Sequence, residues 1–370
     1  MSSIKKIIKH LLKVFYINRV RNYQLFCISF EGGPLGYDSK AFIDWIYKNK
    51  PGEYKIIWGI KDKKYKTDYK NVKFIKIKSL KGIFYLLTSK VILCNINPPS
   101  YIPYRKEQII INTWHGGGVI KKCGKYIANF DEEQFNLTTC FLSSSKVGTD
   151  MVIRDSFMYR GEVLPIGVPR VDMFFNKEEI EKRKKLIKEI YKIPDDYKIL
   201  LYEPTFRKNF ELKENTIDFD MVIKTLNKKF ESKFILIYRL HPMIAEKNKI
   251  TIESAVDASL YPDNQDLLCA ADIFITDYSS GVWELCQKKS PIFIYADDID
   301  SYDRLYFPYT TWPYSVAKNN EELIKNIDNF DEATYLKKVD DYMKFLGCYE
   351  NGDSCKKLYD YIEKKGFTKK

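Results

Sequence analysis

The sequence has few residues that bind transition metals and no long apolar run. Its 370 residues include three histidines and eight cysteines, and no two cysteines have the Cys-x-x-Cys spacing of a zinc site. Several cysteines lie inside apolar runs, where reduced, buried thiols are usual, so we expect a reducing cytoplasm. The acidic tract Asp297-Asp298-Ile299-Asp300 could bind a divalent ion, but we interpret it as a solvated loop. No run of about 18 apolar residues is present, which predicts that no segment spans a bilayer.

The amino-terminal segment also lacks the uninterrupted apolar region and small-residue cleavage site of a signal peptide. Instead, its apolar residues recur at helical spacing and its lysines fall off that face, which predicts a basic amphipathic helix for an anionic membrane surface. An ordinary surface helix packed on its own domain is the alternative. The apolar residues are Ile4, Ile7, Ile8, Leu11, Leu12 and Phe15, and the lysines are Lys5, Lys6, Lys9 and Lys13.

The charge and composition indicate a folded protein with anionic partners. The net charge is +12, which favours nucleic acid, an acidic membrane or a phosphorylated substrate without choosing among them. The lysines could equally reflect a lysine-rich proteome. A 45% hydrophobic and 15% aromatic composition is sufficient for packed cores, and the length suggests two domains.

Short β-branched and aromatic runs alternate with segments of helical periodicity along most of the chain. Such alternation predicts α/β domains whose parallel sheets are covered on both faces, here two facing Rossmann-like domains. The predicted strands are 23–30, 53–60, 72–78, 91–95, 108–112, 140–144, 162–166, 198–202, 233–240, 272–276 and 291–295. The predicted helices are 38–48, 81–88, 177–190, 221–229, 266–271 and 281–287, followed by a charged helical region from 320. The predicted domains are a membrane-contact helix over 1–20, Rossmann-like domains over 21–175 and 176–330, and a helical tail over 331–370.

Ligands of parallel sheets bind outside the carboxyl ends of the strands, and a histidine with three glycines follows the strand at 108–112. In Trp114-His115-Gly116-Gly117-Gly118, the glycines permit close backbone approach to phosphate, and Lys121 adds charge. A histidine with a pKa near neutrality could remove the proton from an attacking hydroxyl. The motif also resembles the HGGG oxyanion loop of esterases, but the chain has no Gly-x-Ser-x-Gly nucleophile elbow.

Three further polar segments follow strands in the second half. Arg239-Leu240-His241-Pro242 offers a guanidinium and an imidazole to phosphate oxygens, although a core or capping histidine is equally consistent. Asp277-Tyr278-Ser279-Ser280 precedes a helix, so its hydroxyls could bind a diphosphate or merely cap that helix. Pro204-Thr205-Phe206-Arg207 offers a hydroxyl and a guanidinium, or is an ordinary surface loop.

These segments, in this order, resemble the bacterial CDP-glycerol glycerophosphotransferase family over most of the chain. The matching residues are Phe30, Glu31, Gly36, Asp38, Lys40, Asn112, Trp114, His115, Gly116, Lys121, Gly124, Pro204, Thr205, Arg207, Arg239, His241, Pro242, Asp277, Tyr278, Ser279 and Ser280. The chain departs from the family where Gly117-Gly118 replaces Thr-Pro and where Glu203 replaces a small residue. Gly281 and Glu284 also differ from the commonest forms.

The resemblance implies a GT-B-like fold with a cleft, an acceptor-side first domain and a CDP-donor-binding second domain. It implies transfer of an alditol phosphate, most simply glycerol phosphate, to a hydroxyl of a lipid-linked glycan or polyol phosphate in teichoic acid or capsule synthesis, with release of CMP. His115 and His241 are then catalytic, His115 as general base. The implied donor- or phosphate-binding residues are Thr205, Arg207, Arg239, Asp277, Ser279, Ser280, Gly116 and Lys121.

The resemblance also implies a peripheral position on the cytoplasmic face of the bacterial membrane. No cofactor and no metal site are predicted, since cationic and hydroxyl groups can stabilise the phosphoryl charge. Nucleic acid is not an expected partner. A GT-B glycosyltransferase that uses a nucleotide sugar is the main alternative, and a non-enzymatic protein that binds membrane or nucleic acid is a remote one.

Overall fold

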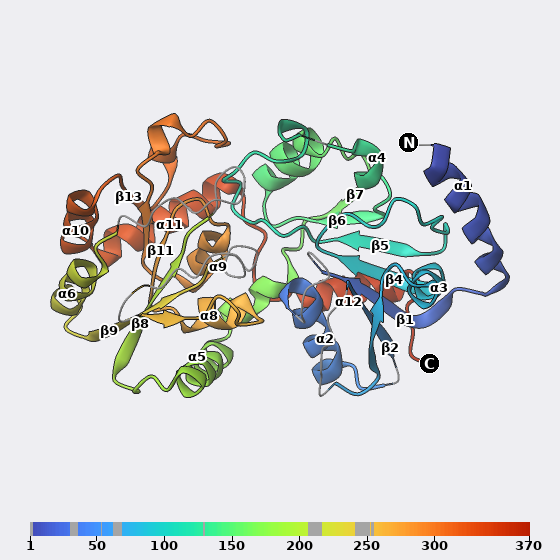
Figure 1. Cartoon of the computed structure of the whole chain (residues 1–370), viewed down its shortest axis with the longest axis horizontal. Coiled ribbons are helices and arrows are strands. Elements are labelled where there is room, and N and C mark those ends of the chain that lie inside the picture. The colour runs from blue at the N-terminus through green and yellow to red at the C-terminus, as the bar shows by residue number, and fades with distance from the viewer. Residues whose placement is uncertain are drawn as a thin grey trace. The chain divides into compact units, whose positions relative to one another are not determined.

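A computed structural model describes residues 3–29, 36–52, 54–61, 69–128, 130–205, 217–240, 252 and 255–370. The chain divides into two compact units. The first comprises residues 1–116, 123–172 and 348–370, and the second comprises residues 117–122 and 173–347. Each unit contains one sheet whose strands are all parallel (Figure 1). The α/β class and the parallel sheets predicted from the sequence are therefore confirmed.

The first unit is a seven-stranded sheet in the order β3-β2-β1-β4-β5-β6-β7. Its strands are β1 Arg21–Ile28, β2 Lys55–Ile60, β3 Val72–Lys76, β4 Ser89–Cys94, β5 Ile109–Asn112, β6 Cys140–Leu142 and β7 Glu162–Leu164. Its α-helices are α1 Ser3–Leu12, α2 Tyr37–Asn49, α3 Leu80–Thr88, α4 Glu132–Phe135 and α12 Ser354–Lys364. A π-helix spans Gly148–Ser156, and 3₁₀ turns span Lys13–Ile17, Gly124–Tyr126 and Pro169–Phe175.

The second unit is a six-stranded sheet in the order β10-β9-β8-β11-β12-β13. Its strands are β8 Tyr197–Glu203, β9 Lys233–Tyr238, β10 Val256–Asp257, β11 Ile273–Thr276, β12 Ile292–Tyr295 and β13 Ser315–Ala317. Its α-helices are α5 Lys177–Tyr191, α6 Phe219–Lys229, α8 Asn264–Ala270, α9 Gly281–Lys288, α10 Asn320–Asp328 and α11 Glu332–Leu346, and 3₁₀ turns span Ile299–Ser301 and Tyr309–Thr311.

Both sheets have the strand order of a Rossmann fold, in which the first strand lies between the second and the fourth. The strand order reverses between β1 and β4 in the first unit and between β8 and β11 in the second. Loops that leave neighbouring strands at such a point diverge to opposite faces of the sheet, and the space beyond the strand ends is where this fold binds ligands. Each unit therefore has its own potential site, near the residues that follow β4 and β5 in the first unit and β8 and β11 in the second.

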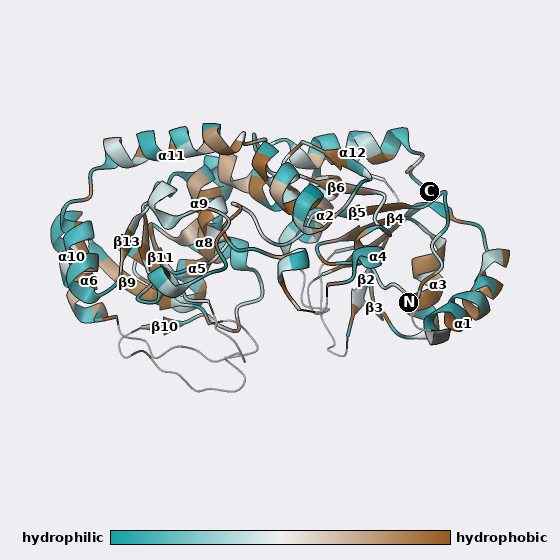
Figure 2. Cartoon of the chain, turned by 90° about the horizontal axis from the view of Figure 1, so that it is seen from above, coloured by the Kyte–Doolittle hydropathy of each residue, from teal (hydrophilic) through white to brown (hydrophobic). Residues whose placement is uncertain are grey.

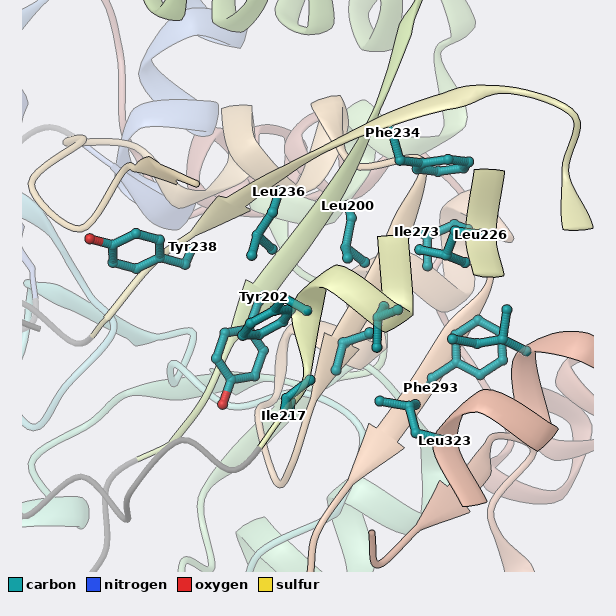
Figure 3. Packing of buried hydrophobic residues seen from close by; sticks show 14 of the residues in the cluster. Leu200, Tyr202, Ile217, Leu226, Phe234, Leu236, Tyr238, Ile273, Phe293 and Leu323 are labelled. Carbon is teal, nitrogen blue, oxygen red and sulfur yellow. The ribbon is translucent and has the colours of Figure 1, made fainter. Parts of the chain in front are cut away.

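Alternation along β8 determines which of its side chains enter the main core of the second unit. Leu200 and Tyr202 pack with Leu226 of α6 and Leu323 of α10 in one buried cluster (Figure 3). Because side chains alternate across a strand, Glu203 lies on the opposite face of the sheet from Tyr202. Helix α8 also contacts β8, and Asn264 at its start hydrogen-bonds with Glu203 on that face.

The two carboxyl-terminal helices belong to different units. Helix α11 packs in the second unit, where Tyr335 donates a hydrogen bond to the carbonyl of Ser290. Helix α12 returns to the first unit, where Asp172 accepts hydrogen bonds from the backbone amides of Ser354 and Cys355 at 2.9 and 2.7 Å. A carboxylate at a helix amino terminus satisfies otherwise unpaired amides and interacts favourably with the helix dipole. The predicted helical tail over 331–370 is thus divided between the two units.

Every predicted strand and helix with bounds between residues 23 and 295 is present, with ends shifted by a few residues. Two strands were missed, because β10 and β13 have only two and three residues and are defined by pairing with β9 and β12. Within the described residues, no helix has the length and apolar character needed to cross a membrane.

Candidate active site

The His115 loop leaves the carboxyl end of β5, beside the switch point of the first sheet. The backbone amide of Thr113 still bonds the carbonyl of Cys94, so the loop begins in register with β4. His115 Nδ1 then lies 3.0 Å from the carbonyl oxygen of Asn95, the residue after β4. A carbonyl oxygen only accepts hydrogen bonds, so Nδ1 holds the proton and the basic lone pair of the neutral ring is on Nε2. This tautomer suits proton abstraction at Nε2.

A buried ion pair between Asp38 and Arg170 contacts the residues just before His115. Asp38 and Arg170 are 1% and 2% exposed, and Arg170 Nη1 lies 2.7 Å from Asp38 Oδ2. The backbone amide of Arg170 donates to Asp38 Oδ1 at 3.0 Å, and the hydroxyl of Thr113 donates to Asp38 Oδ2 at 2.7 Å. Arg170 Nη1 also approaches the carbonyl of Trp114. These bonds join α2 and the 3₁₀ turn at 169–175 to the two residues that precede His115.

Trp114 has an unusual backbone conformation that packing maintains. Its φ of +56° lies in the left-handed region, which costs about 1–2 kcal/mol for a residue with a side chain. Its indole packs against Phe157 at 4.5 Å and against His115 at 4.1 Å between ring centroids. Its backbone amide also donates a hydrogen bond to Asn112 Oδ1 at 2.9 Å. The imidazole of His115 is therefore held on one side by an aromatic ring and at one edge by a carbonyl.

The glycines after His115 lead into the second unit, to which residues 117–122 belong. A Cβ atom at Gly117 would lie 2.6 Å from Cδ1 of Trp283, closer than any real contact, so only glycine fits there. The same contact would obstruct a threonine at position 117. Further along, Lys121 pairs with Leu305 in an antiparallel bridge, and the amide of Lys122 donates to the carbonyl of Arg304.

Asp277 joins the loops that follow β8 and β11 in the second unit. It is buried, and its Oδ1 accepts hydrogen bonds from the backbone amides of Thr205 and Tyr278 at 2.9 and 2.6 Å. A carboxylate so placed orients the two loops, and its negative charge would repel a phosphate. Asp277, one of the predicted donor-binding residues, therefore fixes the backbone of Thr205.

Ser279 and Ser280 lie at the start of α9, as the motif predicted. Ser280 makes no side-chain capping bond, and Ser279 Oγ accepts from the amide of Gly281 at 3.2 Å. Of the two interpretations open for this turn, the capping one therefore applies at most to Ser279. The helix amino terminus and two half-buried hydroxyls together offer donors to an anion.

Arg239 follows β9, which pairs with β8 on the side opposite to β11. Its Nη1 donates to the carbonyl of Tyr261 at 2.9 Å, and its amide extends the ladder to Tyr202. Glu203 ends β8 and lies near the positive charge of Arg239. Burial raises the pKa of the Glu203 carboxyl to about 7, against the opposing effects of Arg239 and Asn264. Glu203 thus places a titrating group among the strand ends of the second unit.

The predicted residues fall into two groups, one on each unit. His115 and Gly116 belong to the first unit, whereas Lys121, Thr205, Arg239, Asp277, Ser279 and Ser280 belong to the second. Arg207 and His241 lie outside the described residues. Sequence reasoning missed Arg170, because its partner Asp38 is 132 residues away along the chain. In the acidic tract, Asp298 accepts from Tyr278 and Asp300 pairs with Lys318, and no metal-binding cluster is found among the described residues.

Comparison with known proteins identifies the family. Residues 11–364 match the family of CDP-glycerol:poly(glycerophosphate) glycerophosphotransferases. The chain belongs to this family. It is an enzyme of the glycerophosphotransferase class, as the resemblance implied.

Two curated relatives agree with this assignment, and two solved structures show the same general fold. The chain is 29% identical to a teichoic acid poly(glycerol phosphate) polymerase of Bacillus spizizenii, covering 90% of each protein. It is 25% identical to a teichoic acid glycerol-phosphate transferase of Staphylococcus aureus, covering 98% of this chain and 99% of that one. The structure of the wall teichoic acid polymerase TagF superposes with a TM-score of 0.83 at 23% identity, covering 98% and 94% of the two chains. A putative UDP-N-acetylglucosamine 2-epimerase of Listeria monocytogenes has the same general fold, with a TM-score of 0.54. The GT-B-like fold class is confirmed.

Proposed function

We propose that this glycerophosphotransferase moves glycerol phosphate, or a related alditol phosphate, from a CDP-activated donor to a terminal hydroxyl of a lipid-linked glycan or polyol phosphate. CMP is the second product. Teichoic acid synthesis is the context that the names of the relatives support, and capsule synthesis uses the same chemistry. The tautomer of His115 is the observation on which the mechanism depends, since it leaves the basic lone pair on Nε2.

In the proposed reaction, the acceptor hydroxyl attacks the phosphorus that bears the alditol. The oxygen–phosphorus bond forms, the hydroxyl proton moves to His115 Nε2, and the bond from phosphorus to the bridging oxygen breaks. That oxygen leaves with the electron pair as part of CMP. The carbonyl of Asn95 accepts from Nδ1 and stabilises the imidazolium that results.

The second unit supplies the proposed donor site. Ser279, Ser280 and the amino terminus of α9 would donate to the diphosphate, with Arg239 and the hydroxyl of Thr205 as further ligands. His241, Arg207 and Lys121 are included on their sequence motifs, and Gly116 of the first unit is a proposed phosphate-binding residue on the same basis. Because positioning and charge stabilisation account for most of phosphoryl transfer, Asp277 contributes by fixing the amide of Thr205.

We also propose that the α1 region touches an anionic membrane on the cytoplasmic face. The structure divides its apolar residues: Leu12 and Phe15 pack against the core of the first unit, whereas four others are 59% to 89% exposed. Helix α1 shows brown and teal residues together in Figure 2. Exposed apolar side chains next to lysines favour insertion at a lipid interface. The exposed residues are Ile7, Leu11, Val14 and Ile17.

The reaction is tested with a panel of donors and a lipid-linked acceptor. We expect CMP release and a mass increase of one alditol phosphate per turnover with CDP-glycerol or CDP-ribitol. Nucleotide sugars are the matched negative donors. Transfer of a sugar, with no CMP from either CDP-alditol, would overturn the proposal.

Membrane contact is tested by sedimentation with vesicles of phosphatidylcholine, with and without phosphatidylglycerol. We expect binding to the anionic vesicles only and a loss of binding in the Leu11→Asp, Val14→Asp double variant. Leu260→Asp changes an equally exposed leucine of the second unit and serves as the control. Unchanged binding of the double variant would contradict this part of the proposal.

A further inference from the structure

Glu203 ends β8, the strand at which the order of the second sheet reverses. Its side chain is 6% exposed, although it lies at the edge of the sheet where this fold binds ligands. The hydroxyl of Thr276, at the end of the adjacent β11, donates to its carbonyl and fixes the backbone there. The backbone of Glu203 is thus tied to the end of β11, the strand after which the proposed donor-binding serines follow.

The hydrogen bonding of this carboxyl is incomplete. Asn264 Nδ2, at the start of α8, donates to Oε2 over a long 3.4 Å. Oε1 is buried and has no partner within the part of the chain that the structure describes, and the same is true of Asn264 Oδ1 there. A buried carboxylate oxygen without a hydrogen bond is costly, and protonation removes the charge that burial disfavours. The surroundings therefore accommodate the protonated form.

The charged groups around Glu203 shift the pKa of its carboxyl in opposite directions. Arg239, which follows β9, favours the ionised carboxylate, and Glu284 on α9 disfavours it. Asp277, after β11, has its Oδ1 directed to the amides of Thr205 and Tyr278. Burial outweighs these effects and raises the pKa of Glu203 to about 7. In the absence of donor the carboxyl is therefore divided between its two forms at neutral pH.

Binding of an anionic donor favours the protonated form of Glu203. A diphosphate bound at the start of α9 and at Arg239 adds negative charge and neutralises the cation that favours the carboxylate. We propose that Glu203 is a positioning residue that takes up one proton as the donor binds, and so makes donor affinity depend on pH. The proton comes from solvent, converts the carboxylate to the acid, and returns to solvent when CMP leaves. This inference rests on the proposed function, since it requires a diphosphate donor in the second unit.

The consequence is a linkage between binding and protonation. Below pH 7 the carboxyl already holds its proton, and donor affinity does not depend on Glu203. Above pH 7 each donor bound must draw a proton, so the dissociation constant of the donor rises by up to tenfold per pH unit. The Glu203→Gln variant has a neutral side chain of the same shape, and its affinity stays at the low-pH value.

Titration calorimetry of the full chain with CDP-glycerol tests this. Binding at pH 7.5 is measured in phosphate and in Tris, whose ionisation enthalpies differ, so the difference in heat counts the protons exchanged. A diphosphate diester has no proton of its own that titrates near neutrality. We expect net uptake by the wild type and by the control Glu332→Gln, on an exposed helix turn. We expect uptake to be lost in Glu203→Gln.

The outcomes separate the two proposals. Binding of CDP-glycerol without proton uptake by the wild type between pH 6 and 9 would overturn the role of Glu203 and leave the proposed function standing. Equal uptake by wild type and Glu203→Gln would do the same, with His115 as the group to examine next. If the wild type binds neither CDP-glycerol nor CDP-ribitol, the proposed function fails and this inference fails with it. If Glu203→Gln does not fold, the wild-type measurement still tests the proposal, because binding without proton uptake overturns the role of Glu203.

Discussion

Replacing Asp38 with asparagine tests whether the buried ion pair holds the His115 loop. The asparagine side chain keeps the size of the original and one acceptor oxygen, but it loses the charge that Arg170 faces. Arg170 would remain 2% exposed, with its guanidinium uncompensated. Breaking a buried pair by removing one partner costs about 3–5 kcal/mol, because an unpaired charge is left in a site of low polarity.

Asp38→Asn should also displace His115 and thereby lower the catalytic rate. Asp38 Oδ2 accepts from both Arg170 and Thr113, and only two backbone steps separate Thr113 from His115. The left-handed backbone of Trp114 depends on the packing and bonds around it. A displacement of about 1 Å in a reacting group can reduce the rate roughly 10²-fold. We therefore expect Asp38→Asn to lower kcat by about that factor.

Thermal unfolding and CMP release measure the two effects. For a unit of this size, the lost stability corresponds to a decrease of about 10 °C in the melting temperature of the first unit. The control is Asp150→Asn, which breaks the Lys146–Asp150 pair of the same unit, 71% and 57% exposed. Exposed pairs contribute at most about 1 kcal/mol, so this variant should resemble the wild type.

The reasoning fails if Asp38→Asn and Asp150→Asn lose similar, small amounts of stability. It also fails in its catalytic part if Asp38→Asn is destabilised yet turns over at the wild-type rate at a temperature where it is folded. In that case the ion pair would stabilise the unit without positioning His115.

Two further expectations concern the second unit. Gly117→Ala places a methyl group against Trp283 and should lower the free energy of unfolding by about 1–3 kcal/mol. The control Gly52→Ala meets only the flexible end of Lys369 and should be nearly neutral. Equal melting temperatures of the two variants would contradict this. Glu203→Gln should stabilise the chain above pH 7. The native carboxyl keeps a proton between the unfolded value of 4.5 and about 7, so wild-type stability falls by up to roughly 3 kcal/mol across that range. Urea unfolding at pH 5 and pH 8 measures the free energy of unfolding of the wild type and of Glu203→Gln. The same difference between the two proteins at both pH values would refute this expectation.

The elements of the fold were predictable because their residues determine them locally. The strand Ile109–Asn112 is a run of β-branched residues, and Gly281–Lys288 begins after a pair of serines. Strands too short for a pattern, such as Val256–Asp257, exist only because a neighbour pairs with them. The return of α12 to the first unit depends on Asp172, which no local pattern links to Ser354.

The candidate site was predictable only where its residues lie within single motifs. His115, Ser279 and Ser280 stand directly after strands, and each occupies the predicted loop. Arg170 has no motif of its own, and its role arises from contact with Asp38. Glu203 was visible as a departure from the family pattern, but its burial depends on side chains of α8 and α9 that packing brings together.

The central claim is that His115 accepts the acceptor's proton at Nε2. The most direct measurement is CMP release by His115→Asn under saturating donor and acceptor, with donor affinity measured on the same preparation. The asparagine amide can still donate to the carbonyl of Asn95, so the loop is preserved while the base is removed. We expect a fall in kcat of about 10²–10⁴-fold with donor affinity unchanged. A kcat within a few-fold of the wild type would contradict the account.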